Sequence, residues 1–137
     1  MAETETESYT VLTTQTFDDT AVTYSSRQDM IAHKGLIIMV DITANTGTSP
    51  TLTVALEEWV PGANAGAGRW VALSAASTGA LDATSVTSKR VIVYPGCAAS
   101  GNAAVDSPVA EQWRVSATVG GTDTPTVTGS VHVTKVP

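Results

Sequence analysis

The chain has 137 residues, which is enough for one domain with a single core and little more. It carries a net charge of −6 and only seven lysines and arginines, which argues against direct binding to nucleic acid or to an anionic membrane. One cysteine, Cys97, cannot form an internal disulfide, and the apolar run Leu36–Val40 is too short to cross a bilayer. No signal-peptide pattern is visible, so we expect a protein made and used in an aqueous, reducing compartment.

The first 34 residues predict an N-terminal arm. Glutamate alternates with small polar residues near the start, so residues 1–8 offer nothing apolar to bury and are expected to be mobile. The segment from Tyr9 to Tyr24 is expected to order against a neighbouring chain. Residues 1–34 are therefore assigned to an arm with short strands, and residues 35–137 to the body of the domain.

Strand patterns inside this arm are short. Residues Tyr9–Thr16 alternate apolar and polar side chains, which predicts a first strand that Asp18 and Asp19 end. Thr20–Tyr24 is expected to form a short second strand. The stretch Ser25–Lys34 fits either one helical turn or a linker.

The clearest pattern in the chain is the alternation of apolar and polar residues over Gly35–Thr43. It recurs over Thr51–Trp59, and a period of two is typical of a strand with one face on a core. The residues between these segments, 44–50, are rich in Asn, Gly, Ser and Pro, which are turn residues. The two strands are therefore predicted to form an antiparallel hairpin with a long connection.

Further strands and loops follow in the middle of the chain. The loop Pro61–Gly68 is built of small and turn-forming residues and leads into a predicted strand over Arg69–Leu73. Another strand is expected over Ser85–Tyr94. The stretch Pro95–Pro108, rich in Ala, Ser, Gly and Asn, is predicted to be the longest loop.

Two last alternating segments, Glu111–Val119 and Thr126–Thr134, are predicted to form a closing hairpin around residues 120–125. Seven to eight strands with turns at this spacing indicate an all-β domain with little helix, either an antiparallel β-sandwich or a jelly-roll-like barrel. The expected core comprises Leu36, Ile38, Val40, Leu52, Val54, Val91, Val93, Trp113, Val115 and Val131.

No group of residues has the composition and spacing of a catalytic, metal or cofactor site. His33 and His132 are the only histidines, and no Cys, His or Asp cluster supplies further metal ligands. Glu57 and Glu58 are adjacent and must point to opposite faces of a strand, so they cannot act as an acid/base pair. No G-x-S-x-G elbow or phosphate-binding loop is present. We therefore expect a protein that is not an enzyme and that needs no cofactor or metal.

The aromatic residues divide into core and surface candidates. Trp70 and Trp113 lie in predicted strands with valine neighbours, which favours core packing. Trp59 ends a strand and is followed by Val60 and Pro61, so we expect it to be partly exposed, like residues that anchor an interface or stack a sugar ring. The candidate interface residues are Tyr9, Val11, Phe17, Tyr24, Trp59 and Pro61.

Four strand and turn segments resemble a known group of proteins. They are residues 35–43 (GLIIMVDIT), 49–54 (SPTLTV), 93–96 (VYPG) and 113–121 (WRVSATVGG). In these segments the chain is similar to small proteins encoded among the structural genes of tailed bacteriophages and prophages. The resemblance covers about residues 35–133. It implies a β-sandwich component of the particle, in the first place a decoration (cement) protein of the head.

We therefore expect a non-enzymatic virion protein that binds and stabilises the capsid. Its partner would be the major capsid protein of the same particle. We expect a homotrimer that is made in the host cytoplasm and located on the capsid surface of the virion. Two alternatives remain open. One is a tail-tube, connector or tail-tip subunit, which would form rings. The other is a carbohydrate-binding β-sandwich module that uses Trp59 and residues 61–68.

Overall fold

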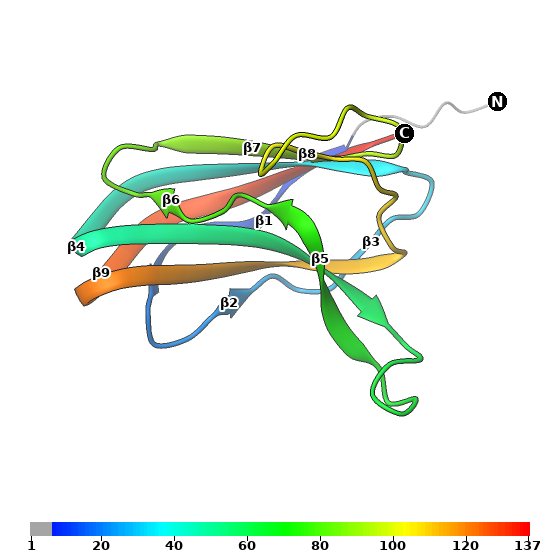
Figure 1. The fold of residues 1–137 in the computed structure, drawn as a ribbon, viewed down its shortest axis with the longest axis horizontal. Helices are drawn as coiled ribbons and strands as arrows, with labels where there is room; N and C mark the ends of the chain where they lie inside the picture. Colours follow the sequence, from blue (N-terminus) through cyan, green and yellow to red (C-terminus); the bar gives the residue numbers. More distant parts are fainter. Residues whose placement is uncertain (1–6) are drawn as a thin grey trace.

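The computed structural model describes residues 7–137, and the strands within that range form a single open sheet without any helix (Figure 1). The prediction of an all-β domain is confirmed. The described residues include no helix that is long and apolar enough to span a membrane. Most of the acidic stretch expected to be mobile, residues 1–6, lies outside the described residues.

The sheet has nine strands among the described residues, compared with the seven to eight expected, and four of the nine contain only two residues. In chain order they are β1 (Glu7–Asp18), β2 (Thr23–Tyr24), β3 (Gln28–Asp29), β4 (Gly35–Val60), β5 (Arg69–Ser77), β6 (Leu81–Asp82), β7 (Ser88–Val93), β8 (Ala104–Val105) and β9 (Gln112–Val136).

Two long strands, β4 and β9, form the centre of the sheet. They contain 26 and 25 residues and run antiparallel, from the pair Gly35–Val136 to the pair Glu58–Trp113. The prediction of two hairpins is therefore wrong. Both segments of the first predicted hairpin lie in β4, and both segments of the second lie in β9. Each segment pairs with the other long strand, not with its predicted hairpin partner. A local alternation specifies which face a residue takes, but it carries no information about the pairing partner.

The residues predicted as hairpin loops form a corner in this ladder. Around this corner Thr46 of β4 pairs with Thr126 of β9 and Thr51 with Gly120, and Thr48 pairs with Thr122 between two register shifts. Gly47 has a φ of +90°, a conformation that side chains other than glycine rarely adopt. Turn-forming residues therefore bend a continuous ladder, as β-bulges do, rather than end it. Both ribbons turn back on themselves at this corner in Figure 1.

The core lies between the halves of the bent sheet. All ten residues that the sequence placed in the core are buried, and none is more than 2% exposed. The alternation on either side of the corner points both halves of β4 and β9 inward. The bend thus encloses apolar side chains from one continuous strand on two sides.

The expected N-terminal arm is part of this sheet. β1 pairs antiparallel with β9 of its own chain, from Glu7–Lys135 to Asp18–Thr126. It buries Leu12 and Phe17 in the core, and the following segment buries Met30. The prediction that residues 9–24 order against a neighbouring chain is therefore wrong, because their apolar side chains complete the core of this chain. The stretch after β2 forms the two-residue strand β3, not a helical turn.

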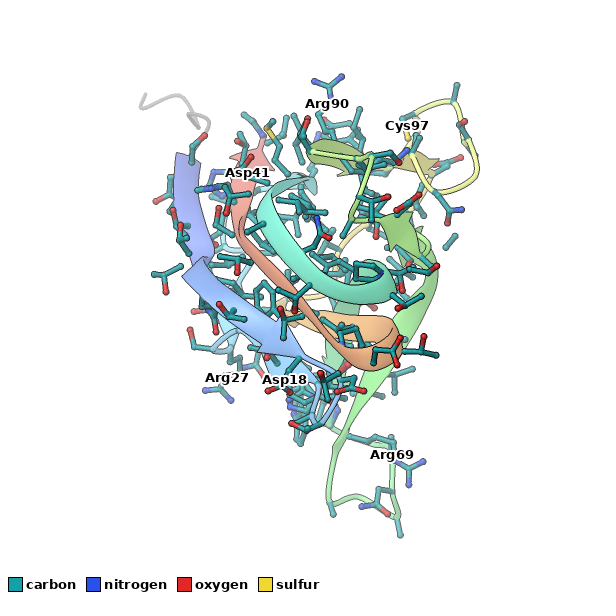
Figure 2. All side chains as sticks on the ribbon, turned by 90° about the vertical axis from the view of Figure 1, so that its left-hand side faces the viewer. Asp18, Arg27, Asp41, Arg69, Arg90 and Cys97 are labelled. Carbon is teal, nitrogen blue, oxygen red and sulfur yellow. The ribbon has the colours of Figure 1, made fainter. Side chains whose placement is uncertain are left out.

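The outer strands flank the two halves of β4. β7 pairs with the first half of β4, β8 runs parallel to β7, and β5 and β6 pair with the second half of β4. The β4–β5 hairpin extends beyond the rest of the sheet in Figure 1, and Figure 2 places Arg69 near its tip.

Candidate functional site

The projecting hairpin is closed by the predicted loop 61–68. Trp59 pairs with Trp70 and Val60 with Arg69, so the strands are in register up to the loop. Gly68 has a φ of +87°, and a Cβ atom at this position would overlap the ring of Trp59. Glycine is therefore required both for the backbone conformation and for the close approach of the indole.

The two tryptophans of the hairpin contact each other on its outer face. Their ring centroids are 5.4 Å apart, and the ring planes meet at 62° in an edge-to-face arrangement. Trp59 is half-buried, as expected. Trp70 was predicted to lie in the core, but it is half-buried on the same face as Trp59, because directly paired residues share a face. Trp113 is fully buried, and its assignment to the core is confirmed.

Arg114 links these tryptophans to β2. Its guanidinium carbon lies 3.7 Å from the ring centroid of Tyr24 and 4.5 Å from that of Trp70. Nε and Nη2 of Arg114 donate hydrogen bonds to Oε1 of Glu57, at 3.0 and 2.7 Å. We call Tyr24, Glu57, Trp59, Trp70 and Arg114 the aromatic–arginine face.

Local pairing explains this arrangement. Arg114 lies between the inward-pointing Trp113 and Val115, so alternation turns it outward. It is directly opposite Glu57 in the β4–β9 ladder. The side chains of Arg114 and Glu57 are only 20% and 15% exposed. Each contact between a guanidinium and an aromatic ring contributes about 0.5–2 kcal/mol, which holds the rings of Tyr24 and Trp70 against Arg114. The face is therefore a rigid platform with its central charge neutralised.

A pocket of about 270 Å³ opens beside Trp59. It is lined by Trp59, Pro61, Glu111 and Gln112. Within the described part of the chain, the side chains of Glu111 and Gln112 form no hydrogen bond. The segment that carries them is held in place by a hydrogen bond of 3.1 Å from the backbone N–H of Ala110 to Glu58. The pocket thus combines an aromatic wall with polar groups that are free to bind.

Three of the six candidate interface residues come together at this end. Trp59 and Pro61 line the pocket, and Tyr24 lies on Arg114. Phe17 is 2% exposed and belongs to the core, so it is not available to a partner. Val11 packs partly buried against the core from β1. The sequence missed Arg114, because a single arginine in a strand gives no signal until its cross-strand neighbours are known.

Tyr9, the sixth candidate, lies on β1, and its ring is next to the side chain of Lys135. Its ring centroid is 5.3 Å from Nζ of Lys135. Its hydroxyl is buried and has no hydrogen-bond partner among the described residues. Burial, followed by the negative charges of Glu7 and Asp29, raises the pKa of Tyr9 to about 12. These properties indicate a packing role within the sheet.

His132 forms a cross-strand network with two hydroxyl groups. Its Nδ1 lies 2.9 Å from Oγ1 of Thr10, and its Nε2 lies 2.9 Å from Oγ of Ser130. A serine hydroxyl beside a histidine nitrogen resembles a nucleophile–base pair. However, Ser130 is only 4% exposed, and this part of β9 is paired with a strand on each side. Because the ladder uses the nearby backbone N–H groups, an oxyanion site is not formed, and the network serves to tie β1 to β9.

Two further carboxyl groups and the thiol have hydrogen-bond partners within the chain. Asp18 and Asp82 accept hydrogen bonds from Thr20 and Thr84, and these bonds lower the pKa of both carboxyl groups. Sγ of Cys97 donates to a backbone oxygen at 3.3 Å. In residues 7–137 there is no group of three His, Cys, Asp or Glu side chains that could hold a metal ion.

The chain matches no protein-family model, no curated protein and no solved structure. The aromatic–arginine face, the pocket beside Trp59 and the projecting hairpin that carries them are the features of the described residues from which we infer a function. They are suited to binding through ring stacking, burial of apolar area and hydrogen bonds.

Proposed function

We propose that this chain is a non-enzymatic structural protein of a tailed bacteriophage particle. Its role would be that of a decoration protein, which binds the major capsid protein on the virion surface and stabilises the head. The proposal is supported by the resemblance of residues 35–43, 49–54, 93–96 and 113–121 to phage structural proteins. It is also consistent with a single stiff sheet from which one hairpin projects.

The observation that carries the proposal is the apolar surface of the projecting hairpin. Val60 and Val71 are 39% and 42% exposed. Because successive residues alternate, they lie on the hairpin face opposite Trp59 and Trp70. A protruding element with exposed apolar side chains on one face can bury them in a groove of the partner, which is how interface anchors contribute most of their energy.

The finer assignments of fold and assembly belong to the same proposal. We assign the bent sheet to the antiparallel β-sandwich class, because its two halves enclose one core. We also propose that the protein is a homotrimer on the capsid. Threefold symmetry about an axis normal to the capsid surface would direct the hairpin of every copy at the particle. The ring-forming alternative, a tail or connector subunit, predicts sixfold or twelvefold particles.

The test uses the purified chain and heads that lack a decoration protein. The chain is expected to bind saturably and to raise the temperature at which the heads break open. A Val60→Ser/Val71→Ser variant is expected to bind at least about tenfold more weakly, because the loss of two buried valines exceeds 1.4 kcal/mol. The matched control is Met39→Ser, since Met39 is 45% exposed in the first half of β4, away from the hairpin.

Each outcome bears on the proposal. Failure of the unmodified chain to bind or to stabilise heads would refute the decoration role, and recovery of the chain in purified tails or connectors would support the ring-forming alternative. If binding is lost equally in the hairpin variant and in the Met39→Ser control, the hairpin is not the attachment element.

A further inference from the structure

The pocket beside Trp59 has the composition of a sugar-binding site. We propose that it binds one neutral saccharide ring, which stacks on Trp59 and donates and accepts hydrogen bonds at Glu111 and Gln112. This site is separate from the capsid-binding surface proposed above, because Val60 and Val71 lie on the other face of the hairpin.

The chemistry of the lining selects this ligand class. An indole ring packs well against the C–H groups of a pyranose. The carboxylate of Glu111 accepts hydrogen bonds, and the amide of Gln112 both donates and accepts them, which matches adjacent hydroxyl groups. Neither side chain has a partner within the described residues, so a ligand would not have to displace an existing bond.

The same lining disfavours other ligands. No lysine or arginine of the described residues lines the pocket, and the Glu111 carboxylate would repel an anionic ligand. A purely apolar ligand would remove the carboxylate and the amide from water without replacing their hydrogen bonds, which is costly. A neutral ring with several hydroxyl groups satisfies both constraints.

The size and stiffness of the pocket fit a single ring. Its volume of about 270 Å³ falls just below the range of about 300–1,000 Å³ found for drug-sized ligands. Trp59 is fixed on one side by Trp70, whose ring centroid is 5.4 Å away, and on another side by Gly68. Because the stacking surface is already ordered, binding does not have to pay for its immobilisation.

The experiment titrates the full-length chain with the methyl glycosides of glucose, galactose, mannose and N-acetylglucosamine. Binding is followed by tryptophan fluorescence and by ligand-observed nuclear magnetic resonance. Trp113 is fully buried, so a fluorescence change reports on the hairpin tryptophans. At least one glycoside is expected to bind saturably, with a Kd on the order of 1 mM, as suits a single ring with few hydrogen bonds.

Variants locate the site. Trp59→Ala and Gln112→Ala are each expected to weaken glycoside binding at least tenfold. Gln112→Ala leaves both tryptophans in place, so it tests the site even if Trp59→Ala perturbs the hairpin. The matched pair is Glu111→Ala, expected to weaken binding, and Asp41→Ala, expected to leave it unchanged. Both residues are exposed carboxylates, and Figure 2 shows Asp41 at the opposite end of the molecule from Arg69.

The results separate this site from capsid attachment. The Val60→Ser/Val71→Ser variant is expected to keep sugar binding while it loses heads. Absence of saturable binding by all four glycosides would overturn the proposal. So would undiminished binding by Glu111→Ala and Gln112→Ala, or a preference for glucuronic acid over the neutral glycosides.

Discussion

Phe17→Ala tests whether β1 is an integral part of the fold. Phe17 is 2% exposed and pairs with Val127, which is fully buried. Removing a buried phenylalanine side chain forfeits about 1.5–3 kcal/mol of transfer free energy. The unfilled cavity raises the total to about 3–5 kcal/mol. Because domains of this kind are stable by about 5–15 kcal/mol, the variant is expected to lose a large fraction of its free energy of unfolding.

The measurement is equilibrium unfolding in urea, with tryptophan fluorescence as the probe. The control is Val22→Ala, because Val22 lies just before β2 and is 38% exposed. It is expected to cost less than about 1 kcal/mol. If Phe17→Ala costs no more than this control, with an unchanged dependence on urea, β1 is a detachable arm and the reasoning from burial fails.

Three further changes test other contacts. Tyr9→Phe is expected to be neutral or stabilising, since it removes a buried hydroxyl that has no hydrogen-bond partner among residues 7–137. The folded pKa of Tyr9, about 12, exceeds the unfolded value of 10.0. The free energy of unfolding of the parent should therefore fall as the pH rises between these two values, and that of the variant should fall less, as urea titrations at several pH values would show. Arg114→Lys should cost about 1–3 kcal/mol in thermal or urea unfolding through loss of stacking and of the fork to Glu57; an unchanged stability would contradict the role of the cation. Gly129→Ala places a methyl group against the backbone of β4 and should cost about 1–3 kcal/mol or more, whereas Gly62→Ala, with open space around it, should not.

The sequence determined which residues of the long alternating segments point inward and where the chain bends, but it misassigned Phe17, which is buried, and Trp70, which lies outward. Burial of alternate residues has a period of two in any half-buried strand, so the core could be predicted without knowledge of the partners. Turn chemistry was equally local. Pro95 and Gly96 predict a turn, and the structure has Gly96 at a φ of +87° with the Cys97 N–H bonded to the Tyr94 oxygen at 3.3 Å.

Tertiary structure decided which strands pair and which side chains meet. The residues at 44–50 and 120–125 have turn chemistry whether they close a hairpin or bend a ladder, and the choice depends on how much apolar surface each arrangement buries. The outward position of Trp70 follows from its pairing with Trp59, and the pocket joins residues about fifty positions apart. Such contacts arise from long-range burial and register, which no local pattern encodes.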